Sequence, residues 1–214
     1  MEFEEEAIFK HPFRCLIAGP SESGKTNLVK NIIFQNQELI YEPPDNITYC
    51  YAEWQSKYDI IKNFNSNIKF IQGLPEISEF NPSCKNLLIL DDFMHLCSED
   101  ESILNLFTTA SHHKSISVFL MTQNIFPVGK YSRTISLNCN YLILMSNPRD
   151  KRQIGDLSRQ MYPKQSKYVI EAFEDAVLKE YGYLFIDLHQ QTNDKFRVQS
   201  GITSEEERIL YVPK

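Results

Sequence analysis

The chain has 214 residues, of which 42% are hydrophobic and 12% aromatic, so it can bury a substantial core within one domain spanning 1–214. A net charge of −6 excludes a protein coated in basic surface, although it leaves room for a local basic channel. No apolar run reaches the ~18 residues that span a bilayer, and the acidic opening of residues 1–10 is the opposite of a signal peptide. We therefore expect an intracellular protein that is not secreted and has no membrane partner, and the five scattered cysteines agree with a reducing compartment.

Apolar patterns predict alternating strands and helices along the chain. Strands are expected at 13–18, 47–51, 87–91, 117–122 and 141–145, and helices at 25–37, 56–63, 99–111 and 151–162. Residues 41–45 are expected to form a loop, 166–180 a further helix, and 183–188 with 196–199 a terminal hairpin. In the tail, 200–214, the segment 204–207 suits either a capped helix or a docking segment. The alternation predicts an α/β fold with a mainly parallel sheet flanked by helices and a C-terminal β-hairpin extension.

Residues 19–26, between the first expected strand and helix, have the pattern of a phosphate-binding loop. Gly19 and Gly24 let backbone N–H groups surround a phosphate, Lys25 reaches its β and γ oxygens, and the Thr26 hydroxyl ligates Mg²⁺. The alternative is a Gly-Ser turn beside an unrelated lysine. The predicted nucleotide-binding residues are Gly19, Pro20, Ser21, Glu22, Ser23, Gly24, Lys25, Thr26 and Asn27.

Two adjacent carboxylates, Asp91 and Asp92, end the apolar strand at 87–91. Asp91 is placed to hold the Mg²⁺ shell, and Asp92 to orient the attacking water or accept its proton. By itself such a pair could equally begin a turn or cap a helix. With a phosphate-binding loop in the same chain, ATP hydrolysis is the favoured interpretation.

Further polar residues fall at the ends of later elements. Gln123 ends the strand at 117–122, where it could contact both the γ-phosphate and the attacking water, or simply begin a turn. The pair His112-His113 is expected to lie in a solvated turn and not to bind a metal. Basic residues gather in one stretch that would suit a nucleic-acid contact or the polar faces of helices: Lys130, Arg133, Arg149, Lys151, Arg152, Arg159, Lys164 and Lys167.

Four segments together, 19–26, 87–92, 115–126 and 133–138, resemble viral genome-packaging ATPases of the FtsK–HerA superfamily, closest to the poxvirus type that also occurs in Polinton transposons. The resemblance implies a RecA-like (ASCE) P-loop NTPase fold and Mg²⁺-dependent ATP hydrolysis. It further implies a homo-oligomeric ring that moves double-stranded DNA into a capsid, with capsid proteins as partners, in the host cytoplasm or nucleus.

The same resemblance implies roles for single residues. Lys25 and Thr26 would bind phosphate and Mg²⁺, Asp91 the metal, Asp92 the catalytic water, and Gln123 would sense the γ-phosphate. Arg133 is the candidate arginine finger, with Arg149 as its competitor. A guanidinium supplied by a neighbouring subunit would stabilise the charge that builds on the γ-phosphoryl oxygens.

Two other functions use the same loop. A small-molecule or nucleotide kinase would turn over only with a phosphoryl acceptor, and a nucleotide-gated scaffold would show negligible turnover. The carboxylate pair and Gln123 favour hydrolysis over both.

Overall fold

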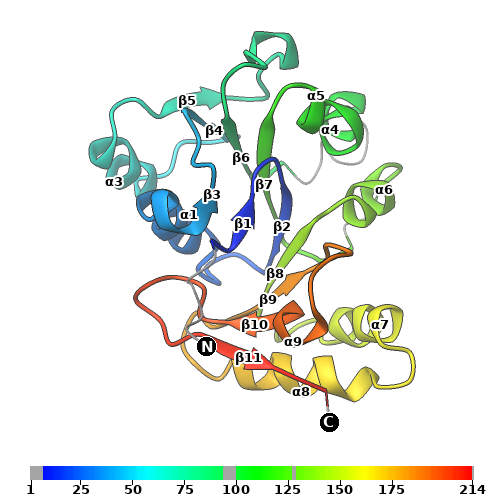
Figure 1. Cartoon of the computed structure of the whole chain (residues 1–214). Helices are drawn as coiled ribbons and strands as arrows, with labels where there is room; N and C mark the ends of the chain where they lie inside the picture. The colour runs from blue at the N-terminus through cyan, green and yellow to red at the C-terminus, as the bar shows by residue number, and fades with distance from the viewer. Residues whose placement is uncertain (1–6, 94–99, 127–128, 214) are drawn as a thin grey trace.

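A nine-stranded sheet forms the centre of the computed structural model, which describes residues 7–93, 100–126 and 129–213 (Figure 1). Its strand order is β11-β10-β9-β8-β2-β7-β6-β4-β5. Six neighbouring strands are parallel: β2 (Arg14–Ala18), β4 (Asn46–Tyr51), β5 (Lys69–Gln72), β6 (Asn86–Asp91), β7 (Ile116–Thr122) and β8 (Tyr141–Met145). This order confirms the predicted mainly parallel α/β sheet, with the strand that precedes the phosphate-binding loop at its centre.

Three antiparallel strands extend the sheet beyond β8: β9 (Tyr183–Asp187), β10 (Val198–Ser200) and β11 (Ile209–Tyr211). β9 and β10 are the predicted terminal hairpin. A short helix, α9 (Asp194–Arg197), lies in their connection, and the Arg197 guanidinium donates to the carbonyls of Asp187, His189 and Thr192. The tail residues 204–207 do not form the helix that was one of the two expectations, because the chain turns there and returns to the sheet as β11.

Four short strands were not predicted: β11, described above, and three others. β1 (Phe9–Lys10) and β3 (Ile40–Tyr41) form a separate two-stranded parallel sheet, which corrects the expectation that the loop begins at residue 41. β5 pairs with β4 at the edge of the main sheet. Strands of two to four residues carry too few side chains for an alternating pattern to identify them.

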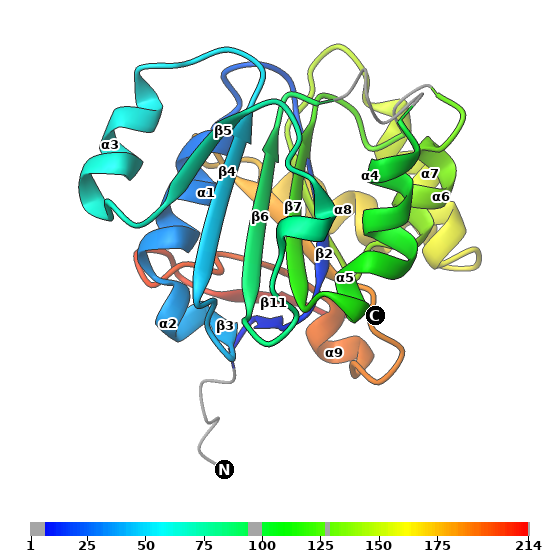
Figure 2. The same cartoon turned by 90° about the horizontal axis from the view of Figure 1, so that it is seen from above.

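Helices cover both faces of the sheet (Figure 2). Those in the first half of the chain are α1 (Lys25–Phe34), α2 (Asn36–Leu39), α3 (Lys57–Phe64) and the 3-10 turn η1 (Ile77–Glu79). Later ones are α4 (Glu101–Asn105), the π-helical segment η3 (Leu106–Ala110), α5 (Ser111–His113), α6 (Ser132–Leu137), α7 (Arg152–Met161) and α8 (Ser166–Ala176). None of the described helices is long and apolar enough to cross a membrane.

Several helix boundaries differ from the expected ones. The helix expected at 25–37 breaks at Gln35, whose backbone leaves the helical region, and α2 then continues the chain. The helix expected at 166–180 already ends at Ala176. The pair His112-His113 was expected in a solvated turn, which is wrong: both residues form the last turn of α5, although their side chains are exposed as expected.

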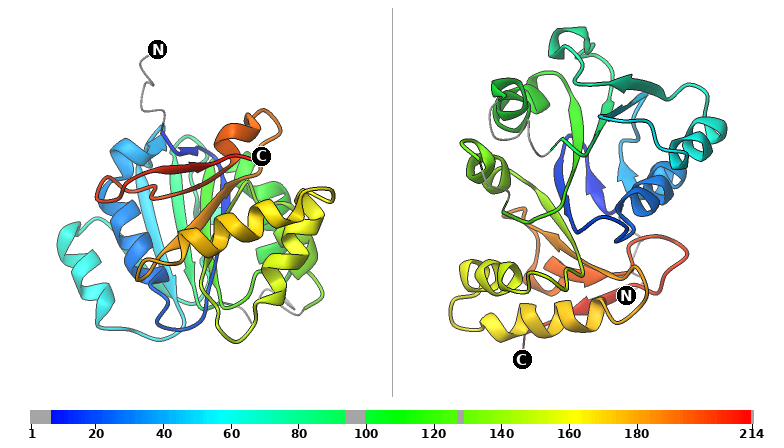
Figure 3. Two further views of the ribbon diagram at one scale, coloured as in Figure 1. Left: turned by 90° about the horizontal axis from the view of Figure 1, so that it is seen from below. Right: turned by 180° about the vertical axis from the view of Figure 1, so that it is seen from behind.

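Alternation along the central strands divides the core into two layers. Cys15 and Ile17 of β2 pack against α1 and α3, whereas Leu16 and Ala18 pack on the side of α4, η3, α6, α7 and α8. Figure 3 shows the helices on the two sides of the sheet from below and from behind. Because β2, β6, β7 and β8 are covered on both faces, every residue in them is buried, as their continuous apolar runs predict.

Candidate functional site

The carboxyl ends of β6 and β7 and the loop before α1 enclose a cavity of about 260 Å³, here called the phosphate-loop cavity. Ligands of open parallel sheets bind at this edge. Eight predicted site residues line the cavity: Ser21, Glu22, Gly24, Lys25, Thr26, Asp91, Asp92 and Gln123. Gln55, Lys57, Met121 and Thr122 complete its wall. The register explains the convergence, because Asp91 pairs with Met121 across β6 and β7, and Thr122 with Ala18 across β7 and β2.

The loop between β2 and α1 is held by glycines and by the neighbouring strand. The Gly19 N–H donates to the Thr122 carbonyl at 3.0 Å, which ties the start of the loop to the end of β7. A Cβ atom on Gly19 would lie 2.6 Å from Ser23 Oγ, so no side chain fits there. Gly24 caps α1 with a φ of 100°, a left-handed conformation that favours glycine. The loop therefore presents backbone N–H groups and the positive end of α1 to the cavity.

Lys25 is the lysine that the phosphate-binding loop itself contributes to this cavity, whose wall also includes Lys57. Its Nζ donates to the carbonyls of Gly19 at 2.5 Å and Pro20 at 2.7 Å, so the side chain folds back over the loop. Burial lowers the pKa of Lys25, and the nearby carboxylates of Asp91 and Asp92 oppose that shift. An ammonium group bonded only to carbonyl dipoles can exchange these partners for the oxygens of an anion.

Asp91 is buried and receives two hydrogen bonds from tyrosines. The hydroxyls of Tyr49, on β4, and Tyr58, on α3, each donate to its Oδ2 at 2.8 Å. Burial raises the pKa of Asp91, and the two tyrosine hydrogen bonds act in the opposite direction. Because both hydroxyls donate to Oδ2, a ligand would bind the other carboxylate oxygen, Oδ1. Sequence patterns did not reveal these tyrosines, because they lie 42 and 33 residues from Asp91.

Asp92 differs from its neighbour in conformation and in exposure. It is exposed, and its φ of 65° lies in the left-handed region, which is unfavourable for a residue with a side chain. Such strain gathers at functional positions. Glu22, which lines the same cavity, has the same φ of 65°. Two strained residues thus face one cavity, one from the phosphate-binding loop and one from the end of β6.

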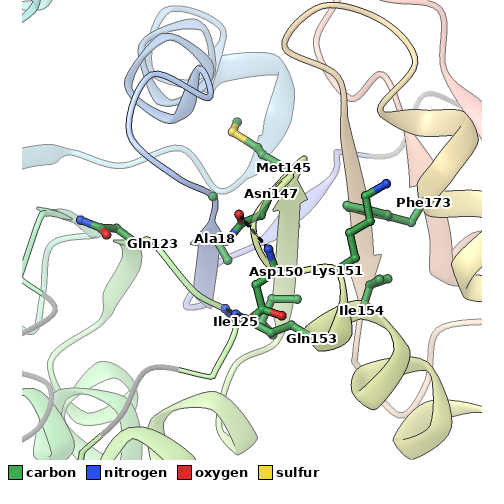
Figure 4. A pocket seen from close by; sticks show the side chains of 11 residues that line it. Ala18, Gln123, Ile125, Met145, Asn147, Asp150, Lys151, Gln153, Ile154 and Phe173 are labelled. Carbon is green, nitrogen blue, oxygen red and sulfur yellow. Dashed lines mark hydrogen bonds between the residues drawn. The ribbon is translucent and has the colours of Figure 1, made fainter.

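Gln123 lies where the phosphate-loop cavity meets a second, small cavity of about 30 Å³. Figure 4 shows Gln123 on one side of the small cavity and Lys151 and Phe173 on the other. Gln153, in the first turn of α7, joins the segment after β7 to the loop after β8. Its Oε1 accepts from the Ile125 N–H at 2.6 Å, and its Nε2 donates to Asn124 at 3.1 Å and to Asp150 at 2.7 Å. The segment that carries Gln123 is therefore bonded to the loop after β8.

Other predicted residues lie outside the phosphate-loop cavity. Arg133, on α6, lines a separate cavity of about 670 Å³ between α6, α7 and the strands β8 and β9. Arg149 is exposed in the loop after β8, where its N–H donates to Asn147 at 3.1 Å. Asn27 is exposed and accepts from Lys30 at 2.8 Å. Pro20 and Ser23 belong to the loop without lining the cavity, and Gly19 lines the small cavity instead.

The donors required for Mg²⁺ are present in the cavity. The Thr26 hydroxyl and the Asp91 carboxylate both line it, and such oxygen donors are the ones that Mg²⁺ takes. In the described parts of the chain, no group of three or more His, Cys, Asp or Glu side chains forms a metal site. This arrangement suits an ion held largely by phosphate oxygens and water.

No protein-family model matches this chain, and no curated protein does. Solved structures do match. The chain is similar to the genome packaging NTPase of Sulfolobus turreted icosahedral virus 2 in complex with sulfate, at a TM-score of 0.56 and 13% identity over 95% of this chain and 97% of that one. It is also similar to the DNA-packaging ATPase of Sulfolobus turreted icosahedral virus, at a TM-score of 0.56 and 15% identity over 95% and 99% of the two chains.

A third similar structure is the packaging NTPase of the second virus in complex with ATP-gammaS, at a TM-score of 0.51 and 14% identity over 94% of this chain and 97% of that one. At these identities the likeness concerns the fold. Together with the strand order and the loop after β2, it shows that the chain has the α/β fold of RecA-like P-loop NTPases.

Proposed function

We propose that the protein is an ATPase that moves double-stranded DNA into a viral capsid as a ring of identical subunits. The observation that carries the hydrolytic part is the phosphate-loop cavity, in which Lys25, the carboxylates of Asp91 and Asp92, and Gln123 lie beside a glycine-bounded loop. Support for the DNA-packaging part comes from the sequence resemblance and from the similar structures, which are named as genome packaging enzymes.

We assign each residue a role in hydrolysis from its position in the cavity. The loop N–H groups and the N-terminus of α1 would bind the phosphates, and Lys25 would leave the carbonyls of Gly19 and Pro20 to pair with phosphate oxygens. Exposed Asp92 would orient water and accept its proton, while Gln123 would contact the γ-phosphate from the end of β7. Thr26 and Asp91 would hold Mg²⁺, which when bound neutralises charge on the phosphate oxygens.

Steady-state ATP hydrolysis, measured against protein concentration with and without long double-stranded DNA, tests this proposal. A DNA-translocating ring predicts a rate per subunit that rises with concentration and is stimulated by DNA. A rate that requires a phosphoryl acceptor would indicate a kinase, and nucleotide binding without turnover would indicate a scaffold. A hydrolysis rate indifferent to DNA and concentration would contradict the motor.

Two variants separate binding from chemistry. Lys25→Ala should abolish nucleotide binding, whereas Asp92→Asn should keep binding and reduce kcat by about 10²-fold or more, because it removes only the proton acceptor. Binding is measured by calorimetry and kcat by phosphate release. Equal loss of binding and turnover in both variants would refute the division of roles.

A further inference from the structure

Tyr181 is an aromatic residue that packs against the phosphate-binding loop and is nevertheless exposed. A Cβ atom on Gly24 would lie 3.0 Å from Cδ1 and 3.2 Å from Cβ of Tyr181, so the two residues are in direct contact. Nevertheless, 58% of Tyr181 is exposed. Its φ of 58° is also in the left-handed region. An exposed aromatic ring held in an unfavourable backbone conformation beside a ligand-binding loop calls for a function.

The turn that carries Tyr181 is fixed from both sides. After α8 ends, the Val177 N–H donates to the Phe173 carbonyl at 3.1 Å, and the Gly182 N–H closes the turn on the Lys179 carbonyl at 2.9 Å. A Cβ atom on Gly182 would lie 2.3 Å from the Ala176 carbonyl oxygen, so the turn requires glycine there. The next residue, Tyr183, already belongs to β9 and pairs with Met145 of β8. The backbone at Tyr181 is thus held beside the phosphate-binding loop by this turn.

Tyr181 and the catalytic candidates flank the loop on opposite sides. In the sheet, β2 lies between β7 and β8, with β6 beyond β7 and β9 beyond β8. Asp91, Asp92 and Gln123 follow β6 and β7, whereas Tyr181 precedes β9. A nucleotide whose terminal phosphate points toward the carboxylates must extend its nucleoside away from them. Tyr181 lies on the side of the phosphate-binding loop that faces β8 and β9.

We propose that the ring of Tyr181 is the platform on which the nucleobase stacks, and that this subsite accepts any of the common bases. The inference rests on the proposed function, since it places the phosphates on the loop at 19–26. Stacking uses the π-face that every base has, so it provides affinity with little discrimination among bases. Removing an aromatic partner of a base weakens binding by about tenfold or more.

The test compares ligands with and without a base. Dissociation constants for a nonhydrolysable ATP analogue, the corresponding GTP analogue and inorganic tripolyphosphate are measured for the wild type, Tyr181→Ala and Tyr181→Phe. We expect Tyr181→Ala to weaken both nucleotides about tenfold or more and to leave tripolyphosphate unchanged. Tyr181→Phe, which keeps the ring and loses the hydroxyl, should bind all three ligands as the wild type does.

One variant serves as a matched control, and three outcomes would contradict the role of Tyr181. Tyr41→Ala removes a similarly exposed tyrosine from β3 and should change no dissociation constant. Wild-type affinity for ATP in Tyr181→Ala would overturn the platform. Equal weakening of nucleotides and tripolyphosphate would also overturn it, because Tyr181 would then act by supporting Gly24. Failure of the wild type to bind any of the ligands would overturn the proposed nucleotide site itself, and the platform with it.

Discussion

The residues around Asp91 stabilise its buried carboxylate and fix its orientation. A buried carboxylate is costly, and burial accordingly raises its pKa. Hydroxyl groups of Tyr49 and Tyr58 offset part of that cost by donating to Oδ2. They also fix the orientation of the carboxylate, because two donors from different elements converge on one oxygen. Perturbed carboxylates held in this way are typical of functional sites.

Tyr58→Phe tests this arrangement at the residue scale. The change removes one donor from Oδ2 and keeps the buried ring, so the carboxylate should lose its fixed orientation without opening a cavity. We expect the Mg²⁺ concentration for half-maximal ATP hydrolysis to rise several-fold, and the free energy of unfolding to fall by about 1–2 kcal/mol. Mg²⁺ titrations of activity and urea unfolding measure the two effects.

Tyr49→Phe removes the second donor and should shift the Mg²⁺ dependence in the same direction. Tyr41→Phe, at an exposed position on β3, serves as the control. Nucleotide affinity measured in Mg²⁺ and in a chelator gives a readout that does not depend on turnover. An unchanged Mg²⁺ dependence in both variants would show that these tyrosines serve the core alone.

At the scale of elements, the segments that follow β7 and β8 form one hydrogen-bonded unit. Gln153 of α7 bonds the backbone of Ile125 and the side chains of Asn124 and Asp150. Asp150 in turn donates its N–H to Asn147, which also accepts the N–H of Arg149. A displacement of the strand end that carries Gln123 would therefore reach the Arg149 loop through α7.

Gln153→Ala should separate these two segments. Because Gln153 contacts neighbours of Gln123, and not the phosphate-binding loop, we expect kcat to fall about tenfold with little change in KM for ATP. Gln153→Glu keeps an acceptor for Ile125 but places a second carboxylate against that of Asp150, so its kcat should fall at least as far. Gln160→Ala, at an exposed position of the same helix, is the control. An equal rise in KM would contradict a positioning role and indicate damage to nucleotide binding.

In the whole molecule, Arg133 and the phosphate-binding loop line two different cavities. Arg133 belongs to α6, on the layer of α4, α7 and α8, and lines the cavity between α6 and α7. Arg149 lies beside Asn147 and Asp150, which line the small cavity next to Gly19. An arginine finger acting between subunits would have to come from a surface that is distant from its own site.

Mixing inactive subunits tests which arginine acts in trans. Lys25→Ala subunits lack a working loop but keep Arg133, and Arg133→Ala subunits keep the loop. We expect their mixture to recover part of the wild-type ATPase rate, because some sites then combine an intact loop with an intact arginine. The same mixture with Arg149→Ala addresses the competing residue. No recovery for Arg133, with mixed assembly verified by native mass spectrometry, would reject its role in trans.

Local sequence patterns predicted the central strands because β2, β6, β7 and β8 each contain a run of apolar residues next to polar ones. They also predicted the phosphate-binding loop, the carboxylate pair and Gln123, since these lie within a few residues of a strand end. Their convergence follows from parallel pairing, which brings the carboxyl ends of neighbouring strands to one edge.

Packing between elements determines which distant side chains join those residues. Tyr49 and Tyr58 reach Asp91, Gln153 bridges two loops, and Tyr181 packs on Gly24, all through contacts between elements far apart in the sequence. The short strands β1, β3 and β11 likewise exist because a neighbouring strand offers unpaired backbone groups, and not because of their own residues. Local patterns report what a segment can form, whereas a contact between segments depends on the packing of the whole chain.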